Sequence, residues 1–185
     1  MYKNTTSITG RDVVGVVGSV ELIVDDQIEG KCWTNTSAIS AKIRVELEKF
    51  GISVYTEKLA TNTVFSPVLH IGGLGYRMGN GVCTGQARFE LYYFGNTRMG
   101  SLEYTGGHFE FRSPVEIWEA SAIFTNSDRL DQQILDKVQE WTDSLIADIS
   151  KARRTEGVKA VLAAWPEYNP LTQAEFDAFM KEPDD

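Results

Sequence analysis

The side chains best suited to acid–base chemistry at neutral pH are the two histidines, His70 and His108. An imidazole beside a carboxylate can act as a general base. Neither histidine belongs to a nucleophile or metalloprotease motif, because the chain contains no G-x-S-x-G, H-E-x-x-H or phosphate-loop sequence. The sequence therefore favours a protein without enzymatic activity, and a small enzyme with a histidine–carboxylate pair is the alternative.

A second group of polar side chains lies on a hairpin that we predict between Val68 and Phe94. From Val82 onward, apolar or small residues alternate with polar ones, as in a strand with one buried face. Tyr and Arg are favoured in interface hot spots, so the polar face is a candidate binding surface. The alternative is a solvated sheet surface whose charges pair across strands. The candidate binding residues are His70, Arg77, Gln86, Arg88, Glu90 and Tyr92.

In the first strand of this hairpin, Leu69 and Ile71 before Gly72-Gly73 have odd numbers and the apolar residues after it have even numbers, so a regular strand would place the two sets on opposite faces. A β-bulge at the two glycines would return every apolar side chain to one face. The turn that closes the hairpin is Gly79-Asn80-Gly81, because these residues tolerate positive φ. The side chains that the bulge would align are Leu69, Ile71, Leu74, Tyr76 and Met78.

Charge and composition exclude several classes of partner. Asp and Glu outnumber Lys and Arg by 26 to 18, for a net charge of -8, so we expect no nucleic-acid binding. No apolar run approaches the roughly 20 residues of a transmembrane helix. The acidic stretch Asp25–Glu29 lacks the spacing of a calcium loop, and the two cysteines lack close metal-binding companions. We predict neither a metal site nor a cofactor.

Hydrophobic periodicity predicts the elements that must position these residues. We expect a strand over 13–24, or two short strands with a glycine kink between them, that ends at Asp25. A helix over 37–50, a strand over 52–55 and a polar loop over 57–66 follow. After Phe94, a turn at Gly95-Asn96 precedes short strands near 102–104 and 109–111, and Pro114 breaks the pattern. A last strand over 115–124, with Trp118, Ala120, Ala122 and Phe124 on one face, leads to the longest helix, over 128–151. A helix over 115–124 is the alternative.

These elements predict an α+β fold. An antiparallel or mixed sheet of four to six strands would carry the helices over 37–50 and 128–151 on one face. Small residues at Gly85 and Ala87 leave room for the longer helix to cross the sheet. We expect a flexible amino terminus over 1–12, a single α+β domain over 13–152 and a helical carboxyl-terminal extension over 153–185, with helices near 158–165 and after Thr172.

This order of elements resembles small exported bacterial α+β domains, such as the amino-terminal domain of TolB and the lipopolysaccharide-transport lipoprotein of the outer membrane. The chain is also similar to uncharacterised exported bacterial proteins in the strand 20–24, Cys32, the helix-to-strand step 45–54 and Trp118 before the long helix. The resemblance covers residues 13–150 and contains no catalytic motif. The chain departs from it by lacking a signal peptide and a lipobox cysteine, and by its tail after Lys151.

The resemblance bears on Cys32 and Cys83, which are the only cysteines. In an exported protein this pair suggests a disulfide that fastens the loop before the first helix to the hairpin, with a stabilisation of about 2–4 kcal/mol. In a reducing cytosol the same residues would be two buried thiols. Both possibilities stay open at this point.

The resemblance implies a role in assembly, in the cell envelope or in the binding of a partner. We therefore predict a non-enzymatic binding or assembly module of the bacterial cell envelope, which binds a protein or a small ligand or associates with itself. A structural component of a larger particle, such as a phage tail, is the alternative outside the envelope. We expect an exported or periplasmic protein if the chain is a mature form, and a cytoplasmic one if Met1 is the native start.

Overall fold

The computed structural model describes residues 8, 10–56, 67–101 and 108–164, and only the backbone at 96–101 and 108–111. The predicted loop over 57–66, Leu102, Tyr104 and the helix after Thr172 lie outside these residues. The elements in chain order are η1 (Gly10–Val16, a 3-10 helix), β1 (Ser19–Ile28), α1 (Thr36–Lys49), β2 (Ser53–Tyr55), β3 (Val68–Arg77), β4 (Cys83–Ser101), β5 (His108–Asn126), α2 (Asp131–Ala152) and α3 (Glu156–Ala164).

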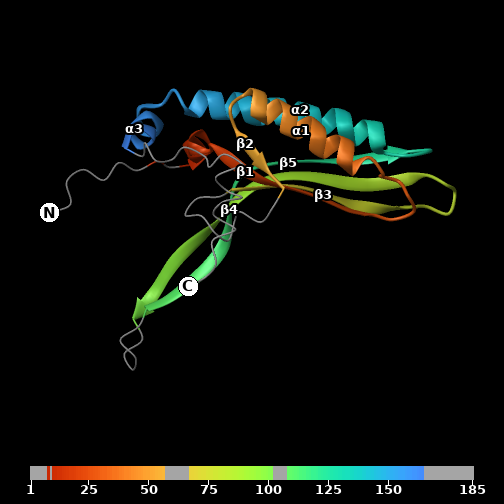
Figure 1. The fold of residues 1–185 in the computed structure, drawn as a ribbon. Helices are drawn as coiled ribbons and strands as arrows, with labels where there is room; N and C mark the ends of the chain where they lie inside the picture. Colours follow the sequence, from red (N-terminus) through yellow and green to blue (C-terminus); the bar gives the residue numbers. More distant parts are fainter. Residues whose placement is uncertain (1–7, 9, 57–66, 102–107, 165–185) are drawn as a thin grey trace, which may run out of the picture.

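The strands form a five-stranded mixed sheet in the order β2-β1-β3-β4-β5. β1 runs parallel to β2 and β3, whereas β3, β4 and β5 are antiparallel neighbours. Both α1 and α2 lie on one face of the sheet (Figure 1). This arrangement confirms the predicted α+β class, the mixed sheet and the two helices on one face.

The periodic apolar stripes form the core between the helices and the sheet. α2 buries one residue per turn against β4 and β5. A Cβ at Gly85 of β4 would lie 3.0 Å from the Leu74 carbonyl oxygen and 3.2 Å from Ile28 Cδ1, so the glycine allows β3 and Ile28 to pack closely against this strand. The buried stripe residues are Ile39, Ile43 and Leu47 in α1 and Ile134, Val138, Trp141, Leu145 and Ile149 in α2.

The predicted strand over 13–24 is wrong in its first half. Residues Gly10–Val16 form η1, and β1 begins only at Ser19 and continues through Asp25 to Ile28. Gly15 explains the difference, because a Cβ there would lie 2.9 Å from the Cβ of Ala152. The valine-rich segment therefore packs under the end of α2 instead of pairing in the sheet.

The predicted bulge at Gly72-Gly73 is also wrong. β3 and β4 pair without interruption from Val68–Tyr92 to Arg77–Cys83. Leu74 and Tyr76 therefore face away from the helices, with 67% and 55% of their surfaces exposed. Gly73 faces the core because the Trp33 ring occupies the space of a side chain: a Cβ at Gly73 would lie 2.5 Å from that ring.

The strands after the hairpin are longer than predicted. β4 continues through Gly95-Asn96, where we expected a turn, and β5 continues through Pro114, where we expected a break. β5 is the last strand of the sheet, and an edge strand tolerates proline. A bulge does occur in β5: Trp118 pairs with Leu91 and Glu116 with Tyr92, so Ile117 is the extra residue.

A disulfide joins Cys32 to Cys83, as predicted for an exported protein. It fastens the loop before α1 to the first residue of β4, and both cysteines are completely buried. The predicted Gly79-Asn80-Gly81 turn is confirmed, since Gly81 has φ 89° and its amide donates to the Met78 carbonyl. No described helix has the length and apolar character needed to cross a membrane.

Candidate functional site

The face of the sheet opposite α1 and α2, here called the outer face, carries the predicted binding residues except Arg77. None of the described helices lies on this face (Figure 1). The strand register aligns its side chains in rows across β1, β3, β4 and β5. Those rows are Ile23–His70–Glu90–Glu119, Asp25–Gly72–Arg88–Ser121 and Gln27–Leu74–Gln86–Ile123.

Arg77 lies apart from the outer face because β3 has no bulge. It pairs with Cys83, whose side chain faces the core. At the exposed end of the strand its guanidinium donates to the Gly30 carbonyl at 3.0 Å and to the Gly81 carbonyl at 2.8 Å. Arg77 therefore ties two turns together instead of joining the other candidate residues.

A shallow groove of about 310 Å³ crosses the middle of the outer face. Glu90 lies at its centre: Arg88 Nη1 is 2.8 Å and His70 Nδ1 is 3.4 Å from its two carboxylate oxygens. Gly72 forms part of the floor, because a Cβ there would lie 3.0 Å from the His70 ring. The lining residues are Asp25, Gln27, His70, Gly72, Gly73, Leu74, Gln86, Arg88 and Glu90.

The His70–Glu90 pair has the composition of a general-base dyad. The described residues that line the groove include no serine, threonine, cysteine or lysine that could serve as a nucleophile. His108 does not join this site, because its backbone pairs with Ser101 near the far end of the β4–β5 hairpin. The groove can form charge-assisted hydrogen bonds, and it presents apolar Leu74 beside them.

Three carboxylates converge next to the groove. Oxygens of Glu90, Glu116 and Glu119 all lie within 4.8 Å of one another, and hard cations prefer such ligands. Desolvation raises the pKa of Glu116 above its usual value, and the charges of Glu119 and Glu90 raise it further. Sequence reasoning missed this trio, because residues 116 and 119 have opposite parity in a regular strand and only the bulge at Ile117 brings them together.

Burial also raises the pKa of Tyr92, and the charges of Glu21 and Glu90 add to this shift. Tyr92 stays a neutral phenol over the ordinary pH range, since its usual pKa is already near 10. Its ring meets Phe94 edge to face at a centroid distance of 5.8 Å. Tyr92 therefore offers an aromatic surface with a polar tip beside the acidic trio.

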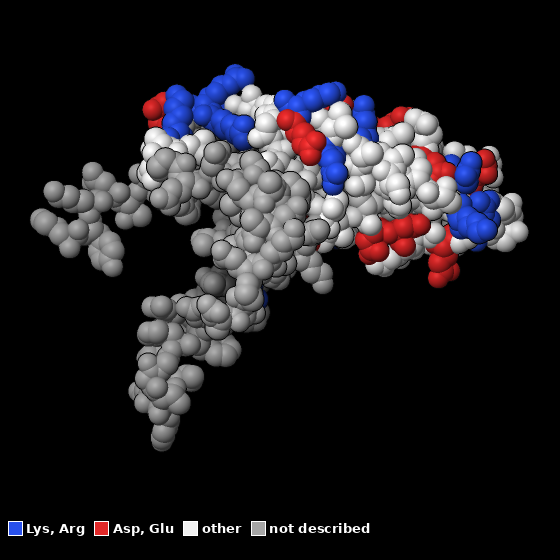
Figure 2. Space-filling model, in the orientation of Figure 1, with Lys and Arg blue, Asp and Glu red and all other residues white. Residues whose placement is uncertain are grey.

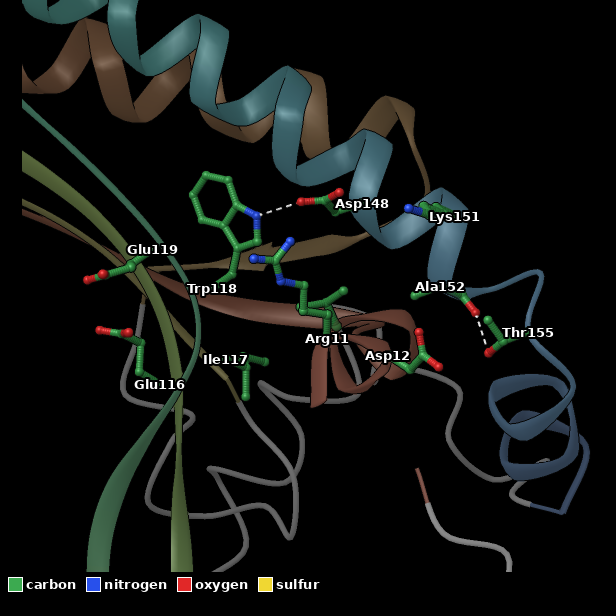
Figure 3. A pocket seen from close by; sticks show the side chains of 11 residues that line it. Arg11, Asp12, Glu116, Ile117, Trp118, Glu119, Asp148, Lys151, Ala152 and Thr155 are labelled. Atoms are coloured by element: carbon green, nitrogen blue, oxygen red, sulfur yellow. Dashed lines mark hydrogen bonds between the residues drawn. The ribbon is translucent and has the colours of Figure 1, made fainter. Parts of the chain in front are cut away.

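A second and larger cavity of about 550 Å³ lies between η1, β5 and α2 (Figure 3). Trp118 forms one wall: its indole N–H donates to Asp148 at 3.0 Å, and its ring packs edge to face on Phe89. Figure 3 shows Arg11 beside Trp118, whereas Glu116 and Glu119 point to the other side of β5. Sequence reasoning missed this cavity because it treated η1 as a strand.

The comparisons with known proteins place the chain in no family. No protein-family model matches it, and no curated protein is similar to it in sequence. Distant structural neighbours include the PelC dodecamer from Paraburkholderia phytofirmans, with 14% identity, a TM-score of 0.32 and coverage of 76% of this chain and 91% of that chain. A minor lipoprotein from Acinetobacter baumannii has 16% identity, a TM-score of 0.32 and coverage of 72% and 95%.

A neuraminyllactose-binding hemagglutinin homolog from Helicobacter pylori is also similar, with 10% identity, a TM-score of 0.25 and coverage of 89% of this chain and 88% of that chain. At these values the resemblance is distant. These neighbours therefore transfer no function to this chain.

Proposed function

We propose that this protein is a non-enzymatic binding module that engages a partner protein through the outer face of its sheet. The observation that carries the proposal is the exposure of large apolar side chains on that face: Leu74 at 67%, Tyr76 at 55% and Ile123 at 81%. Leu74 and Ile123 lie in one row, separated only by Gln86. Apolar side chains that gather on one surface and are flanked by polar groups are typical of an interaction site.

The charged groups beside these apolar side chains suit protein recognition. Glu90 is only 17% exposed and holds Arg88 and His70 in place, so the polar centre of the groove is already ordered before binding. Pre-ordered groups lower the entropic cost of association. In Figure 2 acidic side chains appear beneath the sheet, whereas Lys and Arg lie mainly along the helical side. A partner surface with basic side chains would complement the outer face.

The disulfide supports a function outside a reducing cytosol. Cys32 and Cys83 leave no free cysteine in the chain, and such bonds persist in oxidising compartments. We therefore propose the bacterial cell envelope as the place where the module acts. The oxidising compartment rests on the cysteine chemistry, and the choice of the bacterial envelope rests on the resemblance of residues 13–150 to exported bacterial proteins.

The test compares variants in a binding measurement. A partner captured from envelope extract is purified, and its affinity is measured by calorimetry for the unaltered protein, Arg88→Ala and Tyr92→Ala. We expect either variant to weaken binding at least tenfold, because both side chains lie on the outer face. Arg154→Ala, at an exposed position just beyond the end of α2, is the matched control and should bind as the unaltered protein does. Unchanged affinity for Arg88→Ala and Tyr92→Ala would reject the outer face as the binding surface.

One observation favours an enzyme as the second candidate function, namely the His70–Glu90 contact inside the groove. A His70→Asn variant separates the two functions. A binding module keeps most of its affinity, because Arg88 still holds Glu90, whereas an enzyme that uses His70 as a general base loses its activity.

A further inference from the structure

The free edge of β5 is a separate surface from the groove. From Trp118 to Asn126, β5 pairs with β4 on one side, and no strand among the described residues pairs with its other side. An unpaired edge presents a row of backbone N–H and C=O groups to any extended chain that approaches it. Strand addition at such an edge is a common way to bind a peptide.

The side chains along this edge are accessible on both faces. Glu119, Ser121 and Ile123 are exposed on the outer face, and Ile123 has 81% of its surface free. Trp118, Ala120 and Ala122 are only partly buried on the helical face. An added strand would cover both sets, so the edge has apolar surface to bury as well as backbone groups to pair.

The negative charge at the edge of β5 determines which kind of strand can pair with it. Glu119 belongs to the carboxylate trio with Glu90 and Glu116, and a cation directly opposite it would offset their mutual repulsion. Residues 118–126 contain no lysine or arginine, so pairing of this edge with a second copy of itself would place no cation opposite Glu119. Self-pairing of residues 118–126 therefore lacks the complementary charge, which a basic segment of a partner protein would supply.

The large cavity provides room on the helical side. It lies along residues 116–119 of β5, on the side where Trp118 points (Figure 3). In a strand added beside β5, the residue opposite Trp118 would direct its side chain toward this space, because opposite residues share a face. An aliphatic side chain there would contact the indole.

We propose that the edge of β5 from Trp118 to Asn126 binds an extended, basic segment of a partner protein as a sixth strand. A lysine or arginine of that segment faces Glu119, and an aliphatic residue four positions away faces Ile123. The edge shares Ile123 with the outer face. The strand-addition proposal depends on Glu119 and on the backbone groups of β5 and not on Arg88, so the peptide test and the Arg88→Ala test can fail separately.

The test uses two fluorescent peptides and the full chain. Their sequences are Thr-Val-Lys-Val-Thr-Val-Ile-Thr-Thr for parallel addition and Thr-Thr-Ile-Val-Thr-Val-Lys-Val-Thr for antiparallel addition. Fluorescence anisotropy should show saturable binding of one of them. We expect Glu119→Lys to weaken binding at least tenfold, and a peptide with glutamate in place of its lysine to recover affinity for that variant. Glu156→Lys, an equal charge change on α3, should have no effect.

Backbone methylation tests the strand geometry itself. A strand at a sheet edge donates alternate amides to its neighbour, so N-methylation of one alternate set of peptide amides should abolish binding while the other set is tolerated. Ile123→Thr gives a second variant in case Glu119→Lys unfolds. The proposal is overturned if neither peptide binds, if Glu119→Lys and Glu156→Lys have equal effects, or if both methylated sets bind equally.

Discussion

Glu116 and Glu119 point to the same side of β5 only because Ile117 is the extra residue of a bulge. The bulge directs Ile117 and Trp118 together toward the large cavity and both glutamates toward Glu90. One inserted residue thus produces both the acidic trio and the apolar wall beside the edge. The two surfaces that we propose for binding meet at this irregularity.

The first prediction concerns the pKa of Glu116. We expect Glu119→Gln to lower this pKa, because it removes the nearest like charge, but to leave it above its usual value, because desolvation is the larger cause. NMR titration of the side-chain carboxyl carbon measures the change. In the unaltered protein the raised pKa of Glu116 lowers the free energy of unfolding as pH rises through that pKa, because the folded state then holds a proton that the unfolded state has released. Glu119→Gln should make this decrease smaller. An unchanged pKa in the variant would show that the two carboxylates do not interact.

Alternation along the hairpin was sufficient to predict where most candidate binding residues lie. His70, Gln86, Arg88, Glu90 and Tyr92 share the outer face because strand parity is a local property. Arg77 was misplaced because its predicted orientation depended on a bulge that β3 does not have. Their role in binding stays a prediction, since parity says where a side chain points and not what it contacts.

Gly73 shows how a contact distant in the sequence decides the shape of a strand. The Trp33 ring lies over this glycine, so β3 places Gly73 in the core and Leu74 in solvent. Hydrophobic periodicity predicts a bulge, because only a bulge would turn Leu74 and Tyr76 to the same face as Leu69 and Ile71. Helix periodicity succeeded for α1 and α2 because each stripe is complete within its own segment.

The second prediction tests this packing. Gly73→Ala should lower the free energy of unfolding by about 1–3 kcal/mol, because the new methyl group overlaps the Trp33 ring. Urea denaturation measures the loss. Gly79→Ala in the hairpin turn is the matched control, since a Cβ there has no neighbour within 4 Å, and it should change stability by less than about 0.5 kcal/mol. Equal stability of the two variants would contradict the packing of Trp33 against β3.

The two faces of the sheet have different roles in the whole molecule. The helical face holds the core, and the disulfide and Arg77 fasten the loop before α1 to the β3–β4 hairpin on which the groove lies. The outer face carries exposed apolar and charged side chains that no described helix covers. The α+β class could be predicted from the sequence, whereas the disulfide stayed one of two possibilities, because the redox state of the cysteines depends on the compartment. The large cavity could not be predicted, because it is formed by segments more than 100 residues apart, such as Arg11 and Lys151.

The third prediction concerns the disulfide. Replacing both Cys32 and Cys83 by alanine should lower the free energy of unfolding by about 2–4 kcal/mol, because the bond closes a loop between residues 51 positions apart. Urea denaturation of both proteins under oxidising conditions gives the difference. A loss below about 0.5 kcal/mol would show that the bond contributes little to the fold.

The outer face as a partner-binding surface is the central claim, and site-specific photo-crosslinking in the cells that naturally make this protein tests it most directly. A benzophenone amino acid replaces Leu74, which is 67% exposed on the outer face, or Leu162, which is 37% exposed on α3. We predict a discrete adduct with another protein from position 74 that disappears with Arg88→Ala, and none from position 162. Absence of an adduct at position 74, or the same adduct from both positions, would contradict the claim.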